Sequence, residues 1–297
     1  MVGRLNPNWI VPTAPRGTSD NRAASTAFVT GGGSGGRIVL PSSLYPGNVF
    51  YVATNGVDVA TGGTAAAPWL TFAYAMSQLT SVFDFGGQTV TLQAVAGHAA
   101  FTQTLNVTGW TGGGSFVYDG GGGSITAANS IYISGTIPGQ FMPQNVTLVS
   151  TNGICLYMNG IGVVTIGTGV TFGACTNVHI FCGVGAQVNG PQGDHYTISG
   201  DASFTHVDVN SGTVFLGNCG IVFVGTRTFN VFVQAVFSGL IVFGNNTFKD
   251  SVSGGTPTVH ASKFAASLNG VIYTGGAGVN YLPGNSPGST SSGGQYL

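Results

Sequence analysis

The densest group of side chains that could do chemistry lies in one short stretch, "GDHYTISGDASFTHVDV" at residues 193–209. The stretch contains Asp194, His195, Asp201, His206 and Asp208. All eight acidic residues of the chain are Asp, so carboxylate chemistry has few sources. Glycoside hydrolysis needs two carboxylates about 5–10 Å apart on one surface. This stretch is therefore where such a pair would be sought first.

The segment "FTHVDV" has the alternation of a half-buried strand. Val207 and Val209 would enter the core, and His206 and Asp208 would face solvent together. Arg227 follows 19 residues after Asp208 and would lie beside it one turn later. An Asp, His and Arg patch could bind a sugar or take part in acid-base catalysis. Polar residues on an ordinary solvated strand face are the alternative, and no catalytic residue is assigned.

Four further residues are candidates for carbohydrate binding. Asp194 and His195 belong to the same polar stretch, and Tyr273 and Tyr281 lie in the glycine-rich C-terminal region. An exposed tyrosine ring can stack on the apolar face of a sugar, whereas Phe229, Phe232 and Phe237 have the apolar neighbours typical of a core.

The cysteines predict neither a metal site nor disulfides. Cys155, Cys175, Cys182 and Cys219 lie within apolar, strand-like runs. Cys175 and Cys182 have His179 between them, but the spacing matches no zinc motif. We expect four reduced, buried thiols that behave as small hydrophobic side chains, and no metal or cofactor.

The elements that must position these residues are short strands. The chain has 297 residues, 51 of them Gly, and only 5% are charged, compared with about 25% in an average domain. From residue 88 to 250, apolar runs of four to seven residues end in Gly, Asn or Ser every 6–12 residues. An antiparallel sandwich or barrel and a parallel solenoid both fit, and the short, similar segments favour the solenoid. Repeats of about 20 residues would give roughly eight turns.

We therefore predict an all-β protein, a right-handed parallel β-helix with four regions. Residues 1–36 form an N-terminal arm, a short helix and a glycine-rich joint; 37–87 open the β-helix and include a capping helix; 88–250 form its body; and 251–297 add C-terminal strands and a Gly/Ser-rich tail. The capping helix covers residues 68–83, begins after Pro68, and has an apolar face. That face consists of Trp69, Phe72, Ala73, Met76, Leu79 and Phe83.

The segment at 18–30 predicts a helix too short to be stable alone. Ala23, Ala24, Ala27 and Phe28 would share one narrow face. Small residues let backbones approach closely, so we expect this helix to pack against its own copies or against the structure to which the arm attaches.

Charge excludes some partners. Residues 1–37 have a net charge of +3 and the remainder −4. A surface without clustered Lys and Arg does not suit nucleic acid. No run of 18 apolar residues is present and the first residues do not resemble a signal peptide, so membrane insertion is not expected.

Three segments resemble known proteins. "FYVATNGVDVATGGTAAAPWLTFAYAMSQL" is similar to the opening of pectin-lyase-like right-handed β-helix proteins, with a strand, an Asp/Gly turn, a Pro-Trp-x-Thr segment and a capping helix. "PTAPRGTSDNRAASTAFV" resembles a segment near the N-termini of bacteriophage and prophage tail proteins, and "YLPGNSPGSTSSGGQYL" resembles endings of such proteins.

The resemblance implies a phage tail fibre or tail spike subunit. Such a protein would be a homotrimer of the virion, joined to other tail proteins by its N-terminal arm, and would bind a bacterial surface polysaccharide for host attachment. It would be made in the host cytoplasm without a signal peptide and released by lysis. A polysaccharide depolymerase, either hydrolase or lyase, on the same scaffold is the alternative, although the lyase motifs of the family are absent. An architectural fibre that binds no glycan is a third possibility.

Overall fold

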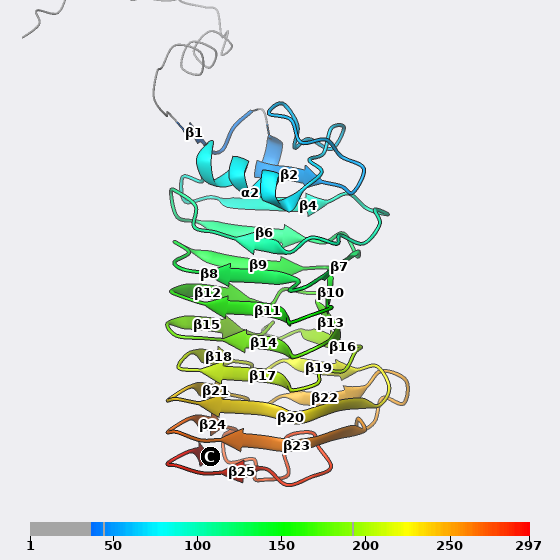
Figure 1. Cartoon of the computed structure of the whole chain (residues 1–297), viewed down its shortest axis with the longest axis vertical. Coiled ribbons are helices and arrows are strands. Elements are labelled where there is room, and N and C mark those ends of the chain that lie inside the picture. Colours follow the sequence, from blue (N-terminus) through cyan, green and yellow to red (C-terminus); the bar gives the residue numbers. More distant parts are fainter. Residues whose placement is uncertain (1–36, 44, 192) are drawn as a thin grey trace, which may run out of the picture. The chain divides into compact units, whose positions relative to one another are not determined.

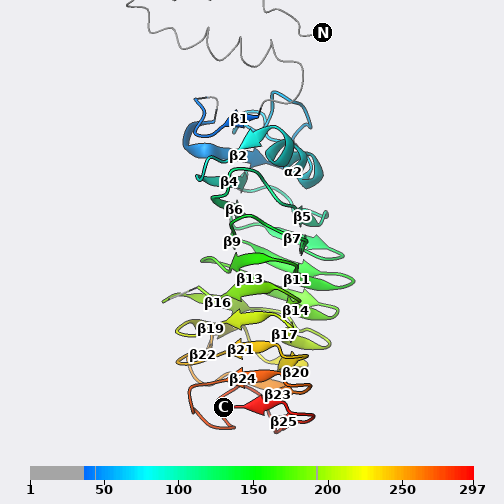
Figure 2. The same cartoon turned by 90° about the vertical axis from the view of Figure 1, so that its left-hand side faces the viewer.

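Parallel strands stacked turn upon turn build the protein, as Figures 1 and 2 show. The computed structural model describes residues 37–43, 45–191 and 193–297. The chain divides into two units, Met1–Arg37 and Ile38–Leu297, and the second holds the whole β-structure described below. The short N-terminal helix predicted at 18–30, with Ala23, Ala24, Ala27 and Phe28, lies outside the described residues.

Three parallel sheets form the walls of the solenoid. The six-stranded sheet contains β7 (Ser124–Ala127), β10 (Thr147–Ser150), β13 (Thr171–Cys175), β16 (His195–Ile198), β19 (Gly220–Phe223) and β22 (Thr247–Asp250). The eight-stranded sheet contains β5 (Leu105–Val107), β8 (Ile131–Ser134), β11 (Ile154–Asn159), β14 (Val178–Cys182), β17 (Thr205–Asn210), β20 (Arg227–Val236), β23 (Val259–Ala266) and β25 (Ser289–Thr290). The ten-stranded sheet contains β2 (Val49–Val52), β4 (Thr89–Ala94), β6 (Ser115–Asp119), β9 (Gln140–Gln144), β12 (Gly162–Thr165), β15 (Ala186–Asn189), β18 (Thr213–Phe215), β21 (Leu240–Val242), β24 (Val271–Tyr273) and β26 (Gln295–Tyr296).

This architecture confirms the predicted all-β parallel solenoid and excludes an antiparallel sandwich for the described residues. The turns are longer than the predicted repeat of about 20 residues. Ser124 pairs with Thr147, 23 residues later, and Leu240 pairs with Val271, 31 residues later. The strands predicted after residue 250 continue the eight-stranded and ten-stranded sheets. The polar turns between sheets vary in length, so the apolar strands alone set the register.

The core is built of side chains stacked from turn to turn. One inward column of the ten-stranded sheet is made of Val164, Val188, Val214, Ile241 and Ile272, all fully buried. Burial of each such side chain contributes about 1.5–3 kcal/mol. The aromatic rings of Phe116 and Phe141 also contact each other from one turn to the next, tilted by 40° with centroids 5.4 Å apart. The core therefore runs the length of the solenoid without a break in these rows.

The predicted capping helix is α2 (Phe72–Ser81), which lies beside β2 and β4 at one end of the solenoid in Figure 1. It is shorter than the predicted 68–83 because Trp69 forms a β-bridge with Val52 before the helix begins. Phe72, Met76 and Leu79 are buried as expected, whereas Ala73 is exposed. The side chain of Thr71 accepts a hydrogen bond from the backbone N–H of Tyr74 and so caps the helix. A 3-10 turn, Pro46–Asn48, and a two-stranded sheet of β1 (Ile38–Val39) and β3 (Phe83–Asp84) complete this end.

The Asp/Gly turn and the Pro-Trp-x-Thr segment fold together. The carboxylate of Asp58 accepts hydrogen bonds from the backbone N–H groups of Leu70 (2.8 Å) and Thr71 (3.0 Å) and from the Thr71 hydroxyl (2.7 Å). The Trp69 ring is fully buried against Gly63, whose φ of +80° lies in the left-handed region and where an added Cβ would come within 2.6 Å of the ring. Glycine is needed there both for space and for backbone conformation.

Candidate functional site

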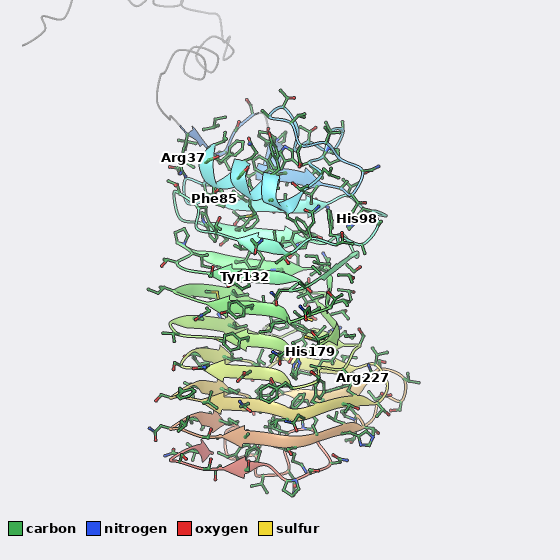
Figure 3. All side chains as sticks on the ribbon, in the orientation of Figure 1. Arg37, Phe85, His98, Tyr132, His179 and Arg227 are labelled. Atoms are coloured by element: carbon green, nitrogen blue, oxygen red, sulfur yellow. The ribbon has the colours of Figure 1, made fainter. Side chains whose placement is uncertain are left out.

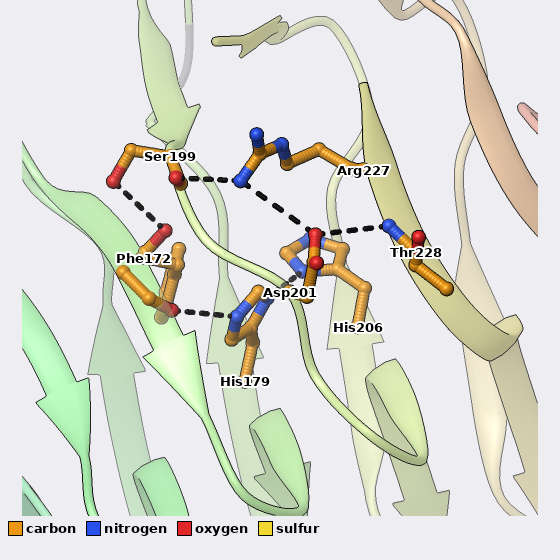
Figure 4. Close-up of polar contacts among 8 residues, drawn as sticks. Phe172, His179, Ser199, Asp201, His206, Arg227 and Thr228 are labelled. Atoms are coloured by element: carbon orange, nitrogen blue, oxygen red, sulfur yellow. Dashed lines mark hydrogen bonds and ion pairs between the residues drawn. The ribbon is translucent and has the colours of Figure 1, made fainter. Parts of the chain in front are cut away.

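His206 lies inside the solenoid, fully buried, and not on the surface as predicted. Its Nε2 lies 2.8 Å from the Tyr196 hydroxyl, and its Nδ1 lies 3.1 Å from Nδ1 of His179. The Nε2 of His179 lies 2.9 Å from the carbonyl oxygen of Gly173, a contact drawn in Figure 4. These three side chains, His179, His206 and Tyr196, are called the core histidine chain below.

One arrangement of protons satisfies the core histidine chain with both rings neutral. Tyr196 donates to His206, His206 donates to His179, and His179 donates to the Gly173 carbonyl. Burial lowers the pKa of His179 to about 4 and lowers that of His206 well below its usual value, the nearby second imidazole adding to the effect. Neutral, fully bonded imidazoles stabilise the fold and are closed to substrate.

The reason for this burial is the corner between two sheets. Thr205, His206 and Val207 are consecutive and all buried, so the alternation of a half-buried strand does not hold at the start of β17. The same occurs at the start of β14, where His179 lies between two buried neighbours. At this corner the side that would face solvent is covered by the neighbouring strands β13 and β16, which supply Gly173 and Tyr196.

Asp201 and Arg227 form a polar contact between turns, shown in Figure 4. An Asp201 carboxylate oxygen accepts a hydrogen bond from the backbone N–H of Thr228 (3.0 Å) and lies 3.6 Å from the Arg227 guanidinium. Arg227 also donates to the carbonyl of Ser199 at 2.7 Å. The prediction that Arg227 lies beside Asp208 is wrong, because the residue of β20 that pairs with Asp208 is Gln234.

Asp208 does face outward, in a column separate from Asp201. On the outer face of the eight-stranded sheet, Asp208 lies between Phe181 of β14 and Gln234 of β20, the residues with which it is in register. Burial against these neighbours raises its pKa to about 6, and its Oδ1 has no hydrogen-bond partner. The four catalytic candidates therefore separate into a buried ring, a contact between turns and an isolated carboxyl, and do not form one patch.

Asp194 and His195 border an open groove on the six-stranded sheet. Asp194 accepts from the backbone N–H of His195 (2.8 Å), and the same oxygen lies 3.0 Å from Nδ1 of that ring. A carboxylate can only accept, so Nδ1 carries the hydrogen, and Nε2 of the neutral ring is an acceptor. Their side chains are 37% and 61% exposed, which leaves both available to a ligand.

The absence of a side chain at Gly220 opens the groove. His195, Gly220 and Thr247 are in register on β16, β19 and β22. A Cβ on Gly220 would lie 2.9 Å from Cβ of His195 and 3.5 Å from the Thr247 hydroxyl oxygen. Lys249 lies two residues after Thr247 on β22, and its ammonium group forms part of the groove wall. The cavity holds about 430 Å³.

The remaining polar wall was not predicted from the sequence. It comes from the turn before each strand, where Gly193, Asn218 and Asn245 all have a left-handed backbone (φ 72°, 56° and 58°). The signal was a repeated pair, Gly followed by Asp or Asn, at 193–194, 217–218 and 244–245. This set of Asp194, His195, Asn218, Asn245, Thr247 and Lys249, with Gly220 as floor, is called the polar groove below.

The two tyrosine candidates lie outside the polar groove. Tyr273 is 46% exposed on β24 of the ten-stranded sheet. The Tyr281 hydroxyl accepts from the backbone N–H of Asn246 (2.6 Å) and donates to its carbonyl (3.3 Å), so this ring is anchored rather than free.

An aromatic column, unforeseen in the sequence, lies on the outer face of the eight-stranded sheet, where Tyr132 is labelled in Figure 3. The rings of Tyr132, Tyr157 and Phe181 stack with centroids 4.6 and 5.0 Å apart and planes within 7°. Because both faces of the Tyr157 ring and one face of each end ring are covered within the stack, the column offers little surface for stacking a sugar.

All four cysteines are buried and unpaired, as predicted. Across residues 37–43, 45–191 and 193–297, no group of three or more His, Cys, Asp or Glu side chains is placed to hold a metal ion. No helix in that part of the chain is long and apolar enough to cross a membrane. In comparisons with known proteins, no family model, curated protein or solved structure matches the chain.

Proposed function

We propose that the protein binds a bacterial surface polysaccharide through the polar groove. The observation that supports this most is the lining: a carboxylate, an imidazole, two amides, a hydroxyl and an ammonium group around one open cavity. Sugar hydroxyls both donate and accept, and these groups offer both functions on a rigid sheet. The groove holds one carboxylate, Asp194, whereas glycoside hydrolysis needs two. Binding without cleavage is the function that this chemistry favours.

We further propose that the protein serves as a structural and receptor-binding component of a phage tail, assembled as a homotrimer. The three sequence segments support this role, because the tail-like N-terminal arm would attach to other tail proteins and leave the solenoid for host attachment. The ten-stranded sheet supports self-association: Asp119 is the one charged residue in its described strands, and Phe215, Val242 and Tyr273 form an outward apolar column. A trimer would bury such a face. A monomeric mass by light scattering at micromolar concentration would contradict this part.

Asp208 supports the alternative, a polysaccharide depolymerase. A carboxyl with a raised pKa near 6 suits a general acid. Neither the polar groove nor the cleft beside Asp201 includes it, and its paired neighbours on the sheet, Phe181 and Gln234, carry no carboxylate. This activity would therefore be built with a carboxylate from another subunit. Release of reducing or unsaturated sugar ends from a bacterial polysaccharide, abolished in Asp208→Asn, would establish this activity.

The test of binding uses a panel of purified bacterial capsular polysaccharides and lipopolysaccharide O-chains with the full-length protein. We expect binding to a subset of the panel, weakened at least tenfold in Asp194→Asn and Lys249→Ala. Lys263→Ala is the matched control, because Lys263 lies in a different cleft and its loss should leave the affinity unchanged. No binding to the panel, or equal affinity in all variants, would contradict the proposal.

A further inference from the structure

A second cleft lies near the C-terminal end of the solenoid, where Figure 1 shows β22 and β23. It holds about 620 Å³, which is within the usual size of a ligand site. No described residue lines both this cavity and the polar groove. It is called the C-terminal cleft below, and the side chains on which the argument depends are Phe248, Thr256, His260, Lys263, Asn280 and Tyr281.

A short chain of hydrogen bonds fixes the ring of His260 in the C-terminal cleft. The backbone N–H of Ala261 donates to Oδ1 of Asn285 (3.1 Å), so Nδ2 of that amide is a donor. This Nδ2 lies 3.1 Å from Nδ1 of His260, which therefore accepts. In the neutral ring the hydrogen is then on Nε2, which has no partner among the described residues. His260 thus offers a hydrogen-bond donor to a ligand.

Lys263 adds a positive charge to the same cleft. Its stem passes beside Gly284 (φ +148°), where an added Cβ would lie 3.1 Å from Cγ of Lys263 and 2.8 Å from the carbonyl oxygen of Ala261. Glycine at this position therefore makes room for the stem. The Lys263 side chain is half-buried, and among the described residues no carboxylate forms an ion pair with it or lines the cleft. A ligand with a negative charge would supply the missing partner.

Aromatic side chains form another part of the wall. The rings of Phe248 and Tyr281 meet edge to face with centroids 5.4 Å apart. The Tyr281 hydroxyl is held by the backbone of Asn246, so its ring has a fixed position. Such a ring can pack on the apolar C–H face of a sugar. Thr256 and Asn280 add a hydroxyl and an amide, which can bind sugar hydroxyls.

We propose that the C-terminal cleft binds an acidic sugar, with its carboxylate on Lys263 and His260 and its ring against Tyr281. A carboxylate has one negative charge and two acceptor oxygens, which match one ammonium group and one imidazole N–H. A neutral sugar would leave the ammonium group unpaired, and a carboxylate without a ring would not contact the aromatic wall.

This second site does not depend on the polar groove or on what the groove binds, because the two cavities are separate. For polysaccharides without acidic sugars, the loss of Lys263 therefore still leaves the affinity of the polar groove unchanged. Such neutral polysaccharides test the groove alone, and a free acidic sugar tests the C-terminal cleft.

The experiment titrates the full-length protein with sodium glucuronate and follows binding by calorimetry. Methyl glucoside, which lacks the carboxylate, and sodium acetate, which lacks the ring, are the comparison ligands. We expect glucuronate to bind about tenfold more tightly than either, and Lys263→Gln, which keeps most of the stem but not the charge, to weaken its binding about tenfold. His260→Ala should also weaken it, because the Nε2–H donor is lost.

Three results would overturn the assignment. The first is equal affinity for glucuronate and methyl glucoside, and the second is full affinity for glucuronate in Lys263→Gln. The third is loss of glucuronate binding in Lys249→Gln but not in Lys263→Gln, which would place the acidic sugar in the polar groove. Circular dichroism checks that each variant is folded, and if Lys263→Gln does not fold, His260→Ala carries the same test.

Discussion

Two histidine-bearing regions of one short stretch have opposite environments. His195 lies 61% exposed beside a carboxylate in the polar groove, while His206, eleven residues later, is fully buried in the core histidine chain. Both residues lie on strands, and both look alike in a polar stretch. What separates them is their place on the strand: His195 is the exposed first residue of β16, whereas His206 lies at the start of β17, where three consecutive residues are buried. In this solenoid, the burial of a side chain therefore depends on how close it lies to a corner between sheets as well as on the alternation along its strand.

The largest expected effect comes from truncating the buried ring. His206→Ala leaves a cavity and removes the partners of the Tyr196 hydroxyl and of His179, so we expect the free energy of unfolding to fall by about 4 kcal/mol. His195→Ala, the surface counterpart, should change it by no more than about 0.5 kcal/mol. Urea denaturation followed by fluorescence measures both. Equal losses in the two variants would break the comparison.

The next largest effect should come from acid, which lowers the stability of the fold by protonating the core histidine chain. The folded protein keeps His179 neutral down to a pKa of about 4, whereas the unfolded chain protonates it near 6.5. Its contribution is therefore complete above pH 6.5 and is lost as the pH falls towards 4, by about 3 kcal/mol. Urea midpoints measured between pH 7 and 4 should show the decline, smaller in His179→Gln and unchanged in His195→Asn. The same decline in both variants would contradict a role for the core rings.

The ionisation of Asp208 should change stability with pH in the opposite direction to that of His179. Its pKa is raised from 3.8 to about 6, so the folded state is penalised once the carboxyl is charged, and stability falls as the pH rises from 4 to 6. We expect Asp208→Asn to raise the free energy of unfolding at pH 7 by about 1–2 kcal/mol and to flatten that part of the profile. Asp201→Asn is the control, because that carboxylate accepts a backbone hydrogen bond and should not gain stability on neutralisation. Destabilisation by Asp208→Asn would show that its charge has a partner.

The fold could be predicted from the sequence to the extent that local chemistry determined it. Short apolar runs ending in Gly or Asn specified stacked parallel strands, and the helical spacing of Phe72, Met76 and Leu79 specified the cap. The repeat length was underestimated, because the polar turns between sheets have no apolar pattern from which their number of residues could be predicted. Asp58 and Trp69 were recognised as parts of a motif, and the structure supplies its physical reason: Asp58 accepts hydrogen bonds from the residues just before α2, and the Trp69 indole N–H donates to the Val59 carbonyl.

The candidate site was predictable only in part. Asp194 and His195, predicted from the sequence as carbohydrate-binding candidates, lie side by side at the surface. The groove beside them depends on Gly220, and the effect of its missing side chain can be judged only once the strand register is known. The register also places Arg227 beside Asp201, not beside Asp208 as predicted. Such pairings join residues about 25 to 30 positions apart through turns of unequal length, and a single sequence does not specify them.

The central claim, that the groove floored by Gly220 binds polysaccharide, is tested most directly by filling it. Gly220→Ser keeps an ordinary backbone conformation but places a side chain between His195 and Thr247. With the polysaccharide that the unchanged protein binds best, titration calorimetry on Gly220→Ser, shown to be folded by circular dichroism, should show affinity reduced at least tenfold. The new Cβ would lie 2.9 Å from Cβ of His195, so the melting temperature should also fall. Full affinity in a folded Gly220→Ser protein would contradict the account.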